Sequence, residues 1–308
     1  MIELTRVTKR YGDKAVVDDL SLTVARGAFF VLVGPSGSGK STTLKMINRL
    51  VGIDAGAIAV DGRNVRDMPA EALRRGMGYV IQSIGLFPHW TVADNIATVP
   101  RLLRWPEARV RARVAELIAL LQLDAAEVAR KYPHELSGGQ QQRIGVARAL
   151  AADPGIVLMD EPFGALDPIT RDALQGEIAR IHAATEKTIV FVTHDMDEAL
   201  RLGTEIAILD QGRLVQCGSP ADILRSPAND FVRTFVGGAD FGLRLLGVTR
   251  VRDRLRPNGA LAGPPVSPDA SLKEALSLMI ASRRDALPVR DGAGRSLGAV
   301  HLADLARA

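Results

Sequence analysis

The chain contains the stretch Gly34-Pro35-Ser36-Gly37-Ser38-Gly39-Lys40-Ser41, which matches the pattern G-x-x-x-x-G-K-[ST] at every fixed position. The residues just before it, Phe29-Phe30-Val31-Leu32-Val33, are all apolar and predict a buried strand. Thr42 to Leu50 follow with a helical pattern. A strand, a glycine-rich loop and a helix in this order predict a phosphate-binding loop at the carboxyl edge of an α/β sheet.

This loop predicts binding of ATP together with Mg²⁺. Its glycines allow the backbone N–H groups to surround a phosphate, and the positive end of the helix dipole points at the same place. Lys40 is expected to reach the β- and γ-phosphates, and the Ser41 hydroxyl is expected to ligate Mg²⁺. The residues assigned to the nucleotide are Gly34, Pro35, Ser36, Gly37, Ser38, Gly39, Lys40, Ser41 and Thr42.

Another apolar run ends in two carboxylates. Ile156-Val157-Leu158-Met159 predicts a buried strand, and Asp160 and Glu161 follow it directly. The end of this strand is expected to place Asp160 beside the phosphate loop, where it holds Mg²⁺ directly or through water. Glu161 points in a different direction and is the best candidate to polarise the attacking water. Thr188–Val192 predicts a further buried strand of the same sheet.

The stretch Leu136-Ser137-Gly138-Gly139-Gln140 precedes a helical pattern over Gln141–Leu150. Ser137 with Gln140 fits a capping box, which is a purely structural interpretation. A cap does not require two adjacent glycines in the first turn, where each costs up to about 1 kcal/mol against alanine. Glycines let a phosphate approach the helix N-terminus, so the stretch predicts a second anion site separate from the first.

These motifs resemble those of the ABC ATPases and stand in the same order, over about residues 1–236. The resemblance identifies Gly34–Ser41 as Walker A, Gln82 as the Q-loop residue and Leu136–Gln140 as the signature. It identifies Asp160-Glu161 as Walker B, Gly164-Ala165-Leu166-Asp167 as the D-loop and His194 as the switch histidine. It implies that two copies pair head to tail. Each ATP then lies between Walker A of one copy and the signature residues Ser137, Gly138, Gly139 and Gln140 of the other.

The resemblance also implies roles that no local pattern explains. Tyr11 aligns with the aromatic residue that stacks on adenine, a contact worth roughly 1–3 kcal/mol. Gln82 is implied to contact Mg²⁺ or the water and to report the nucleotide state to a membrane subunit. His194 follows a predicted strand and is implied to hydrogen-bond the γ-phosphate. Asp167 is expected to cap the helix that begins at Pro168, and the resemblance adds a role across the dimer interface.

The predicted fold is therefore an α/β P-loop NTPase domain of the ABC ATPase type, with an antiparallel β region, a helical subdomain and a small C-terminal α/β module. The first domain is expected over residues 1–236, with the helical subdomain at about 88–155 and a long helix over Pro106–Gln122. A second long helix is expected over Pro168–Ala184, a linker over 237–265, and a loop rich in Gly and Pro over Arg256–Pro268.

The end of the chain, 266–308, has a short βαββα-like pattern and resembles a single CBS repeat. The resemblance rests on Val266–Leu276, on Ala286-Leu287-Pro288-Val289 and on Gly298-Ala299-Val300.

From Gly237 onward the chain has ten Arg and one Lys against six Asp and one Glu, so this part holds the whole net charge of +4. Two interpretations remain open, a solvated surface and attraction to an anionic membrane face. Nucleic acid is not expected as a partner, because the basic residues are scattered and few aromatics lie among them.

The sequence predicts no membrane span, because no stretch of about 18 apolar residues occurs. Its first residues also lack a basic-then-apolar export segment. A peripheral location on the cytoplasmic face of the inner membrane is expected. Permease subunits are expected to supply the transmembrane pathway, and a substrate-binding protein is expected to deliver the transported solute. The single cysteine, Cys217, excludes an intramolecular disulfide.

Two stretches, Thr42–Leu50 and Gln82–Trp90, resemble the quaternary-amine importers. Those transporters take up osmoprotectants such as glycine betaine, choline or carnitine. In the second stretch, Leu86, Phe87 and Trp90 are expected near a loop, where the resemblance implies a groove for a coupling helix of the permease; core packing is the alternative. The other functions considered are a sugar or polyamine importer and a non-transport ABC ATPase that acts on nucleic acid or ribosomes.

Overall fold

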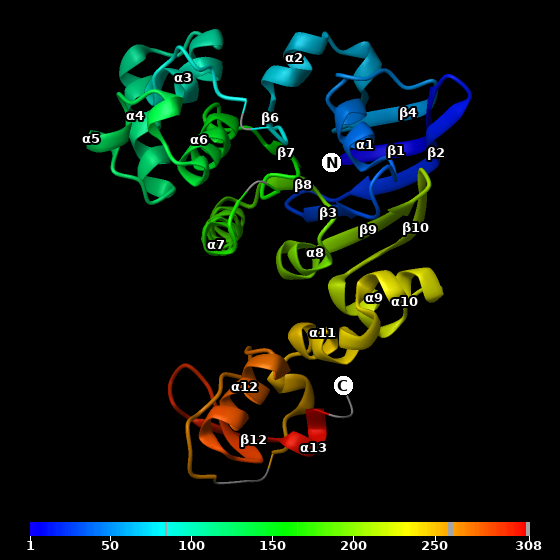
Figure 1. The fold of residues 1–308 in the computed structure, drawn as a ribbon, viewed down its shortest axis with the longest axis vertical. Coiled ribbons are helices and arrows are strands. Elements are labelled where there is room, and N and C mark those ends of the chain that lie inside the picture. Colours follow the sequence, from blue (N-terminus) through cyan, green and yellow to red (C-terminus); the bar gives the residue numbers. More distant parts are fainter. Residues whose placement is uncertain (84, 165, 258–260, 306–308) are drawn as a thin grey trace. The chain divides into compact units, whose positions relative to one another are not determined.

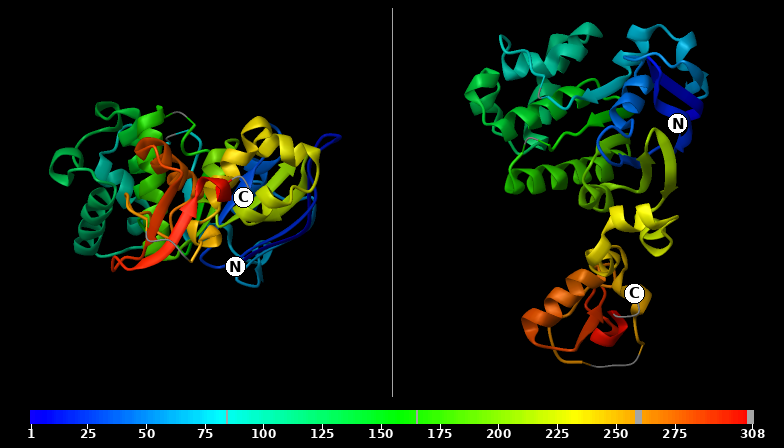
Figure 2. Two further views of the ribbon diagram at one scale, coloured as in Figure 1. Left: turned by 90° about the horizontal axis from the view of Figure 1, so that it is seen from below. Right: turned by 45° about the vertical axis from the view of Figure 1, so that its right-hand side comes forward.

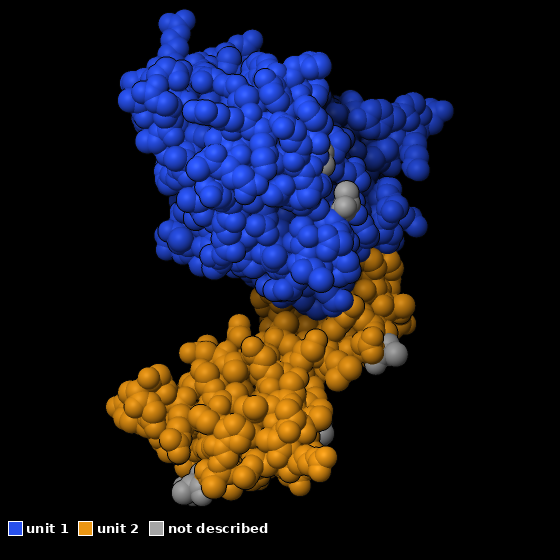
Figure 3. All heavy atoms as spheres, turned by 60° about the vertical axis from the view of Figure 1, so that its left-hand side comes forward, with its two compact units in different colours: residues 1–217 blue, residues 218–308 orange. Residues whose placement is uncertain are grey.

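The structure of the chain, a computed structural model, describes residues 1–83, 85–164, 166–257 and 261–305. It contains two compact units, Met1–Cys217 and Gly218–Ala308, which are coloured separately in Figure 3. The first unit thus ends before the expected domain boundary after residue 236. Parts of four predicted features lie outside the described residues: Ile84 of the permease groove, Ala165 of the D-loop, 258–260 of the linker and 306–308 of the CBS-like repeat.

A six-stranded sheet with the order β10-β9-β3-β8-β7-β6 carries the first unit. Its strands are β3 (Phe29–Val33), β6 (Met77–Val80), β7 (Ile156–Asp160), β8 (Thr188–Thr193), β9 (Glu205–Asp210) and β10 (Arg213–Gly218). β3, β7 and β8 are buried along their whole length, as their continuous apolar runs predict, so the three predicted strands are confirmed.

The pairing of these strands gathers the chemical motifs at one edge of the sheet. β8 lies between β3 and β7 and is parallel to both. Parallel neighbours end at the same edge, and the chain leaves these three strands at Gly34, His194 and Glu161. The order of the strands therefore positions the phosphate loop, the switch histidine and the acidic pair together.

An antiparallel sheet with the order β2-β1-β4-β5 forms the second layer of the first unit. It consists of β1 (Ile2–Tyr11), β2 (Lys14–Val24), β4 (Ala55–Val60) and β5 (Arg63–Asn64). Its apolar face shares one core with the parallel sheet and with α1 (Lys40–Ile47), and Leu4, Phe30, Leu44 and Ile58 all belong to that core. The predicted antiparallel region is confirmed.

Four helices form a lobe that Figure 1 and Figure 2 show in cyan to green. They are α3 (Val92–Leu102), α4 (Glu107–Leu120), α5 (Ala125–Val128) and α6 (Gly138–Leu150), and α3 packs against both α4 and α6. The helix predicted over 106–122 forms as α4, with Pro106 just before its first turn. The other α-helices described in this unit are α2 (Ala70–Arg75), α7 (Pro168–Thr185) and α8 (Met196–Leu202).

The helix after the phosphate loop is displaced from its predicted range. It runs over Lys40–Ile47, whereas the sequence pattern predicts Thr42–Leu50. Arg49 adopts a left-handed conformation with φ 52°, and the N–H of Leu50 donates to the carbonyl of Lys45. An α-helix cannot continue through a left-handed residue, so the helix ends at Ile47, three residues earlier than expected.

The second unit contains a further set of helices and one hairpin. These are α9 (Pro220–Arg225), α10 (Asp230–Val236), α11 (Phe241–Val248), α12 (Leu272–Ser282), β11 (Ala286–Arg290), β12 (Ser296–His301) and α13 (Leu302–Leu305). The expected linker, 237–265, is folded in much of its described part, because α11 packs against α9 and α12. The first strand of the predicted βαββα pattern is reduced to a single bridge between Val266 and Val289.

A bidentate ion pair connects Arg256, which precedes the expected CBS-like repeat, to Asp304 on α13. Arg256 Nε lies 2.9 Å from Oδ2 and 3.1 Å from Oδ1 of Asp304, and Nη2 lies 2.5 Å from Oδ1. Asp304 Oδ2 also accepts from the N–H of His301 at 3.2 Å. The hydrogen bonds from Arg256 hold the pKa of the largely buried Asp304 carboxyl below its usual value.

Asp304→Asn is expected to destabilise the second unit, because it weakens two charge-assisted bonds in a fixed fork geometry. Calorimetry of the full chain should show the unfolding transition of this unit at a lower temperature. In the wild type the same stabilisation should be lost as the pH falls through the depressed pKa of Asp304, because the unfolded carboxyl binds its proton at higher pH. Asp269→Asn breaks an exposed pair with Arg252 and should shift the transition little; equal shifts would contradict the assignment.

Candidate nucleotide-binding and hydrolysis site

Two glycines of the phosphate loop have no space for a side chain. A Cβ on Gly34 would lie 2.0 Å from the carbonyl oxygen of Leu209, and one on Gly39 would lie 2.6 Å from that of Val16. Both glycines also have positive φ, 156° and 96°. The obstacles are backbone atoms of β9 and β2, which cannot rotate away. The curled form of the loop is therefore imposed by strands that are distant in the sequence.

Lys40 lies under this loop with its ammonium group enclosed. Its Nζ donates to the carbonyls of Gly34 and Pro35, both at 2.8 Å, and only 5% of the residue is exposed. Burial lowers the pKa of Lys40, and the negative charges of Glu161 and Asp160 oppose this effect. A cation held against the backbone of a glycine-rich loop is suited to the phosphates of a nucleotide.

Ser41 and Asp160 meet where the sequence predicts a metal. The Ser41 hydroxyl donates to Oδ1 of Asp160 at 2.6 Å, which joins the first turn of α1 to the end of β7. Mg²⁺ prefers such oxygen ligands and usually binds through one or two carboxylates together with substrate phosphates. In the part of the chain that the structure describes, no group of three or more His, Cys, Asp or Glu could hold a metal ion.

Glu161 receives contacts from both predicted catalytic partners. Gln82 Nε2 donates to its Oε2 at 3.3 Å, and His194 Nδ1 lies 3.2 Å from the same oxygen. Glu161 has φ 44°, a left-handed conformation, and its N–H donates to the carbonyl of Val192 at 3.0 Å. This turn aims Glu161 away from Asp160, as expected for neighbouring residues with separate roles. The three residues predicted to be catalytic thus form one cluster.

A cavity of about 450 Å³ beside the phosphate loop includes residues that the sequence patterns do not single out. It is lined by Ser36, Gly37 and Ser38 together with Lys14, Ala15, Asp210 and Gln211. The last four come from the start of β2 and from the turn between β9 and β10. Taken alone they are ordinary turn and strand-end residues, and only the fold brings them to the loop.

Tyr11 and Asp167 do not join the cluster around Glu161. Tyr11 ends β1 with 53% of its surface exposed, and Lys9 Nζ lies 5.3 Å from its ring centroid. Asp167 caps α7 by accepting from the N–H groups of Ile169 and Thr170, both at 3.1 Å, so the predicted cap is confirmed. Their implied contacts with adenine and with a second copy stay predictions.

The signature residues begin α6 in the helical lobe, apart from α1 (Figure 1). The predicted capping box is confirmed, with Ser137 N–H to Gln140 Oε1 at 3.0 Å and Gln140 N–H to Ser137 Oγ at 3.3 Å. The glycines differ. A Cβ on Gly138 would meet nothing within 4 Å, but one on Gly139 would lie 2.4 Å from Cγ2 of Thr170 on α7. Packing therefore explains Gly139, and Gly138 is the glycine that faces open space.

Comparison with known proteins identifies the family. The family model for ABC transporters matches residues 17–164, and the CBS domain model matches residues 264–308. The glycine betaine uptake system ATP-binding protein YehX of Escherichia coli (strain K12) is 54% identical over 305 residues, which cover 99% of each chain. The glycine betaine/carnitine/choline transport ATP-binding protein OpuCA of Bacillus subtilis (strain 168) is 50% identical over 292 residues, 94% of this chain and 76% of that protein.

Solved structures agree with this family. The dimeric bacterial ABC transporter cassette MJ0796 is 34% identical, with a TM-score of 0.65, and the match covers 71% of this chain and 99% of that one. The same cassette in a dimeric post-hydrolysis state with ADP and Pi is 32% identical, with the same TM-score and coverage.

The chain belongs to the ATP-binding subunits of ABC transporters, and it is an ATPase. Within this family, relatives with matches along nearly the whole chain include glycine betaine, choline and carnitine uptake proteins, and the expected CBS domain is confirmed at the C-terminus. The resemblance predicted from the motifs is therefore confirmed. The dimeric cassettes agree with pairing of two copies. None of the described helices combines the length and the apolar character that a membrane crossing requires.

The two signature glycines provide a paired test. Gly139→Ala should destabilise the first unit by about 1–3 kcal/mol through overpacking, and Thr170→Ser in the same chain should restore the stability by removing the obstructing methyl group. Gly138→Ala should fold normally and should weaken the dimerisation that ATP induces. Thermal unfolding and light scattering measure both effects. Similar unfolding temperatures for the two single variants would contradict the distinction.

Proposed function

We propose that this ATPase powers import of a small quaternary-amine osmoprotectant, such as glycine betaine, choline or carnitine, through partner permease subunits. The identity of about 50% to uptake proteins for these solutes, along nearly the whole chain, carries the proposal. The subunit is peripheral, on the cytoplasmic face of the membrane, and a substrate-binding protein delivers the solute. Sugar and polyamine import, and action on nucleic acid or ribosomes, receive no comparable support.

Two copies of the chain pair head to tail in this proposal. The phosphates of each ATP lie between the phosphate loop of one copy and Ser137 and Gly138 of the other. The open space at Gly138 supports this arrangement, because nothing in its own chain occupies it. Ile169, next to the Asp167 cap, supports it too, since 83% of this apolar residue is exposed beside the expected interface.

Hydrolysis follows from the cluster around Glu161. Lys40 and the loop N–H groups hold the phosphates, and Glu161 accepts the proton of a water that attacks the γ-phosphorus as the bond to ADP breaks. His194 donates a hydrogen bond to the γ-phosphate. Mg²⁺, when bound, neutralises charge on the phosphates, and Ser41, Asp160 and Gln82 are the residues that would hold it. Closing and reopening of the dimer moves the permease.

The permease is proposed to dock at a groove beside α6. A cavity of about 290 Å³ is lined by residues that include Tyr79, Phe87 and Arg148. The rings of Phe87 and Trp90 lie 4.6 Å apart, and both residues are more than 40% exposed, whereas Leu86 is half-buried. An exposed aromatic pair beside an apolar cavity suits a coupling helix that brings apolar side chains of its own.

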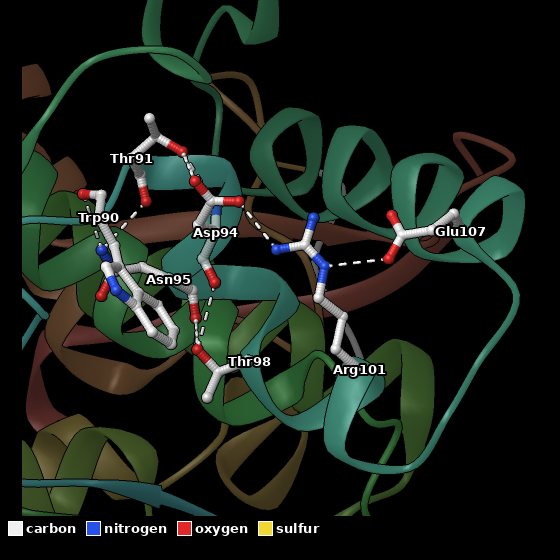
Figure 4. Close-up of polar contacts among 7 residues, drawn as sticks. All are labelled: Trp90, Thr91, Asp94, Asn95, Thr98, Arg101 and Glu107. Atoms are coloured by element: carbon white, nitrogen blue, oxygen red, sulfur yellow. Dashed lines mark hydrogen bonds and ion pairs between the residues drawn. The ribbon is translucent and has the colours of Figure 1, made fainter.

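The loop that presents these aromatics is held by one buried amide. Asn95 on α3 is fully buried, and its Nδ2 donates to the carbonyls of Phe87, Trp90 and Thr91 at 3.0–3.2 Å. Its Oδ1 accepts from the N–H of Phe87 at 2.8 Å. Figure 4 shows Asn95 beneath Trp90 and Thr91, with Asp94 and Arg101 on another side of the helix. The shape of the docking loop thus depends on Asn95.

Uptake into lipid vesicles tests the proposed function. The subunit, reconstituted with the permease subunits that co-purify with it and with the substrate-binding protein, should take up glycine betaine, choline or carnitine when ATP is supplied, and should not take up maltose or spermidine. Glu161→Gln should retain ATP binding and abolish uptake. Uptake of the sugar or the polyamine would overturn the solute class and leave the ATPase assignment intact.

Asn95→Ala is expected to separate hydrolysis from transport. Uptake should fall about tenfold, the equivalent of about 1.4 kcal/mol of weakened docking, while the ATPase activity of the isolated subunit changes little. Ile118→Val on α4 is the control, because it removes one methyl group from a fully buried side chain of the same lobe and destabilises that lobe by about 0.5–1.5 kcal/mol. Equal loss of uptake in both variants would show that general stability, and not the loop, is responsible.

A further inference from the structure

A buried carboxylate is bonded to the loop that carries the switch histidine. Glu198 lies in the first turn of α8, and 6% of it is exposed. Its Oε2 accepts a 2.6 Å hydrogen bond from the hydroxyl of Thr193, the last residue of β8 and the neighbour of His194. Thr193 Oγ1 accepts in turn from the N–H of Asp195 at 3.0 Å. Glu198, Thr193 and Asp195 thus form one chain of hydrogen bonds that includes the residues on both sides of His194.

The start of α8 does not require this carboxylate. Asp195 is the N-cap, and its Oδ1 accepts from the N–H groups of Asp197 at 2.8 Å and Glu198 at 3.4 Å. Asp195 thus already caps the helix, one turn before Glu198. Burying a polar group costs free energy unless it is hydrogen-bonded, and the hydrogen bond that Glu198 accepts from Thr193 lies outside the cap of α8.

The bonds of Glu198 also reach the helix that follows the D-loop. Gln175 Nε2 on α7 donates to Oε1 of Glu198 at 3.4 Å. Gln175 Oε1 accepts from Nη1 of Arg201 at 2.9 Å, and Arg201 pairs with Asp172. A single network therefore connects the loop of His194 on one side with α7, which begins at the Asp167 cap, on the other.

We propose that Glu198 is a positioning residue for ATP hydrolysis: through Thr193 it fixes the backbone on both sides of His194 and keeps the imidazole beside Glu161. The side chain of His194 is 59% exposed, and among the described residues its one hydrogen-bond contact is with Glu161. Its orientation therefore depends on the backbone that carries it. The proposal rests on the role proposed above for His194.

The protonation of Glu198 makes glutamine an informative substitute. Burial raises the pKa of Glu198, the nearby Asp195 raises it further, and the Thr193 hydroxyl bond and the charges of Arg171 and His194 act in the opposite direction. The carboxyl group thus keeps its proton to higher pH than an exposed glutamate. Glutamine retains one acceptor oxygen for the Thr193 hydroxyl, whereas alanine retains none.

ATPase kinetics of the purified full chain test the proposal. Thr193→Val and Glu198→Ala should lower kcat by about 10- to 100-fold, as expected when a group at the reaction centre is displaced by about 1 Å, with little change in KM for ATP. Glu198→Gln should recover most of the lost kcat. A double variant, His194→Ala with Glu198→Ala, should be no slower than His194→Ala alone, because Glu198 acts through His194.

Thr188→Val is the matched control at the other end of β8. Thr188 is 1% exposed, and its hydroxyl accepts from the N–H of Gly27 at 2.9 Å, so the variant also loses one buried hydroxyl bond. Its unfolding temperature should fall about as much as that of Thr193→Val, but its kcat should stay at the wild-type value.

Three results would overturn the proposal: equal losses of kcat in the two threonine variants, a rise in KM without a change in kcat, or additive effects in the double variant. A wild-type kcat for His194→Ala alone would instead remove the role proposed for His194. None of these measurements involves transport, so they do not depend on the solute.

Discussion

The backbone hydrogen bond from Glu161 N–H to the carbonyl of Val192 is the constraint on which the hydrolysis site depends. It anchors the chain just after β7 to the neighbouring strand β8 and holds Glu161 in a left-handed conformation, which a non-glycine residue adopts when its surroundings enforce it. Two adjacent carboxylates are thereby separated. Asp160 faces the Ser41 hydroxyl, and Glu161 faces Gln82 and His194.

The position of that bond follows from the order of the strands. Because β8 lies between β3 and β7, the phosphate loop, the switch histidine and the acidic pair leave the sheet side by side. The long stretch of chain between β6 and β7 folds into the helical lobe, which carries the signature residues away from this edge. If the signature residues bind nucleotide as proposed, one chain contains the parts of two half-sites.

Much of this architecture could be predicted from the sequence, because its signals are local. The apolar runs before Gly34 and Asp160 predict strands, and the glycine pattern with Lys40 predicts the phosphate loop. What could not be predicted depends on contacts between distant residues. The clash that excludes a side chain at Gly139 involves Thr170, and the obstacles around Gly34 and Gly39 come from other strands. The bond between Thr193 and Glu198 is close in sequence, but its significance depends on burial, which no pattern reports. Helix α11 (Phe241–Val248) lies in the range expected to be a linker, and its packing against α9 and α12 is again a contact that no local pattern reports.

The open space at Gly138 bears on when the protein consumes ATP. If a second copy completes each site, free subunits hydrolyse ATP only during an encounter, and their specific activity rises with concentration. Two subunits held on one permease experience a local concentration on the order of millimolar and no longer depend on such encounters. The division of the site then makes turnover conditional on assembly: subunits without a transporter conserve nucleotide, and consumption scales with the number of complete transporters.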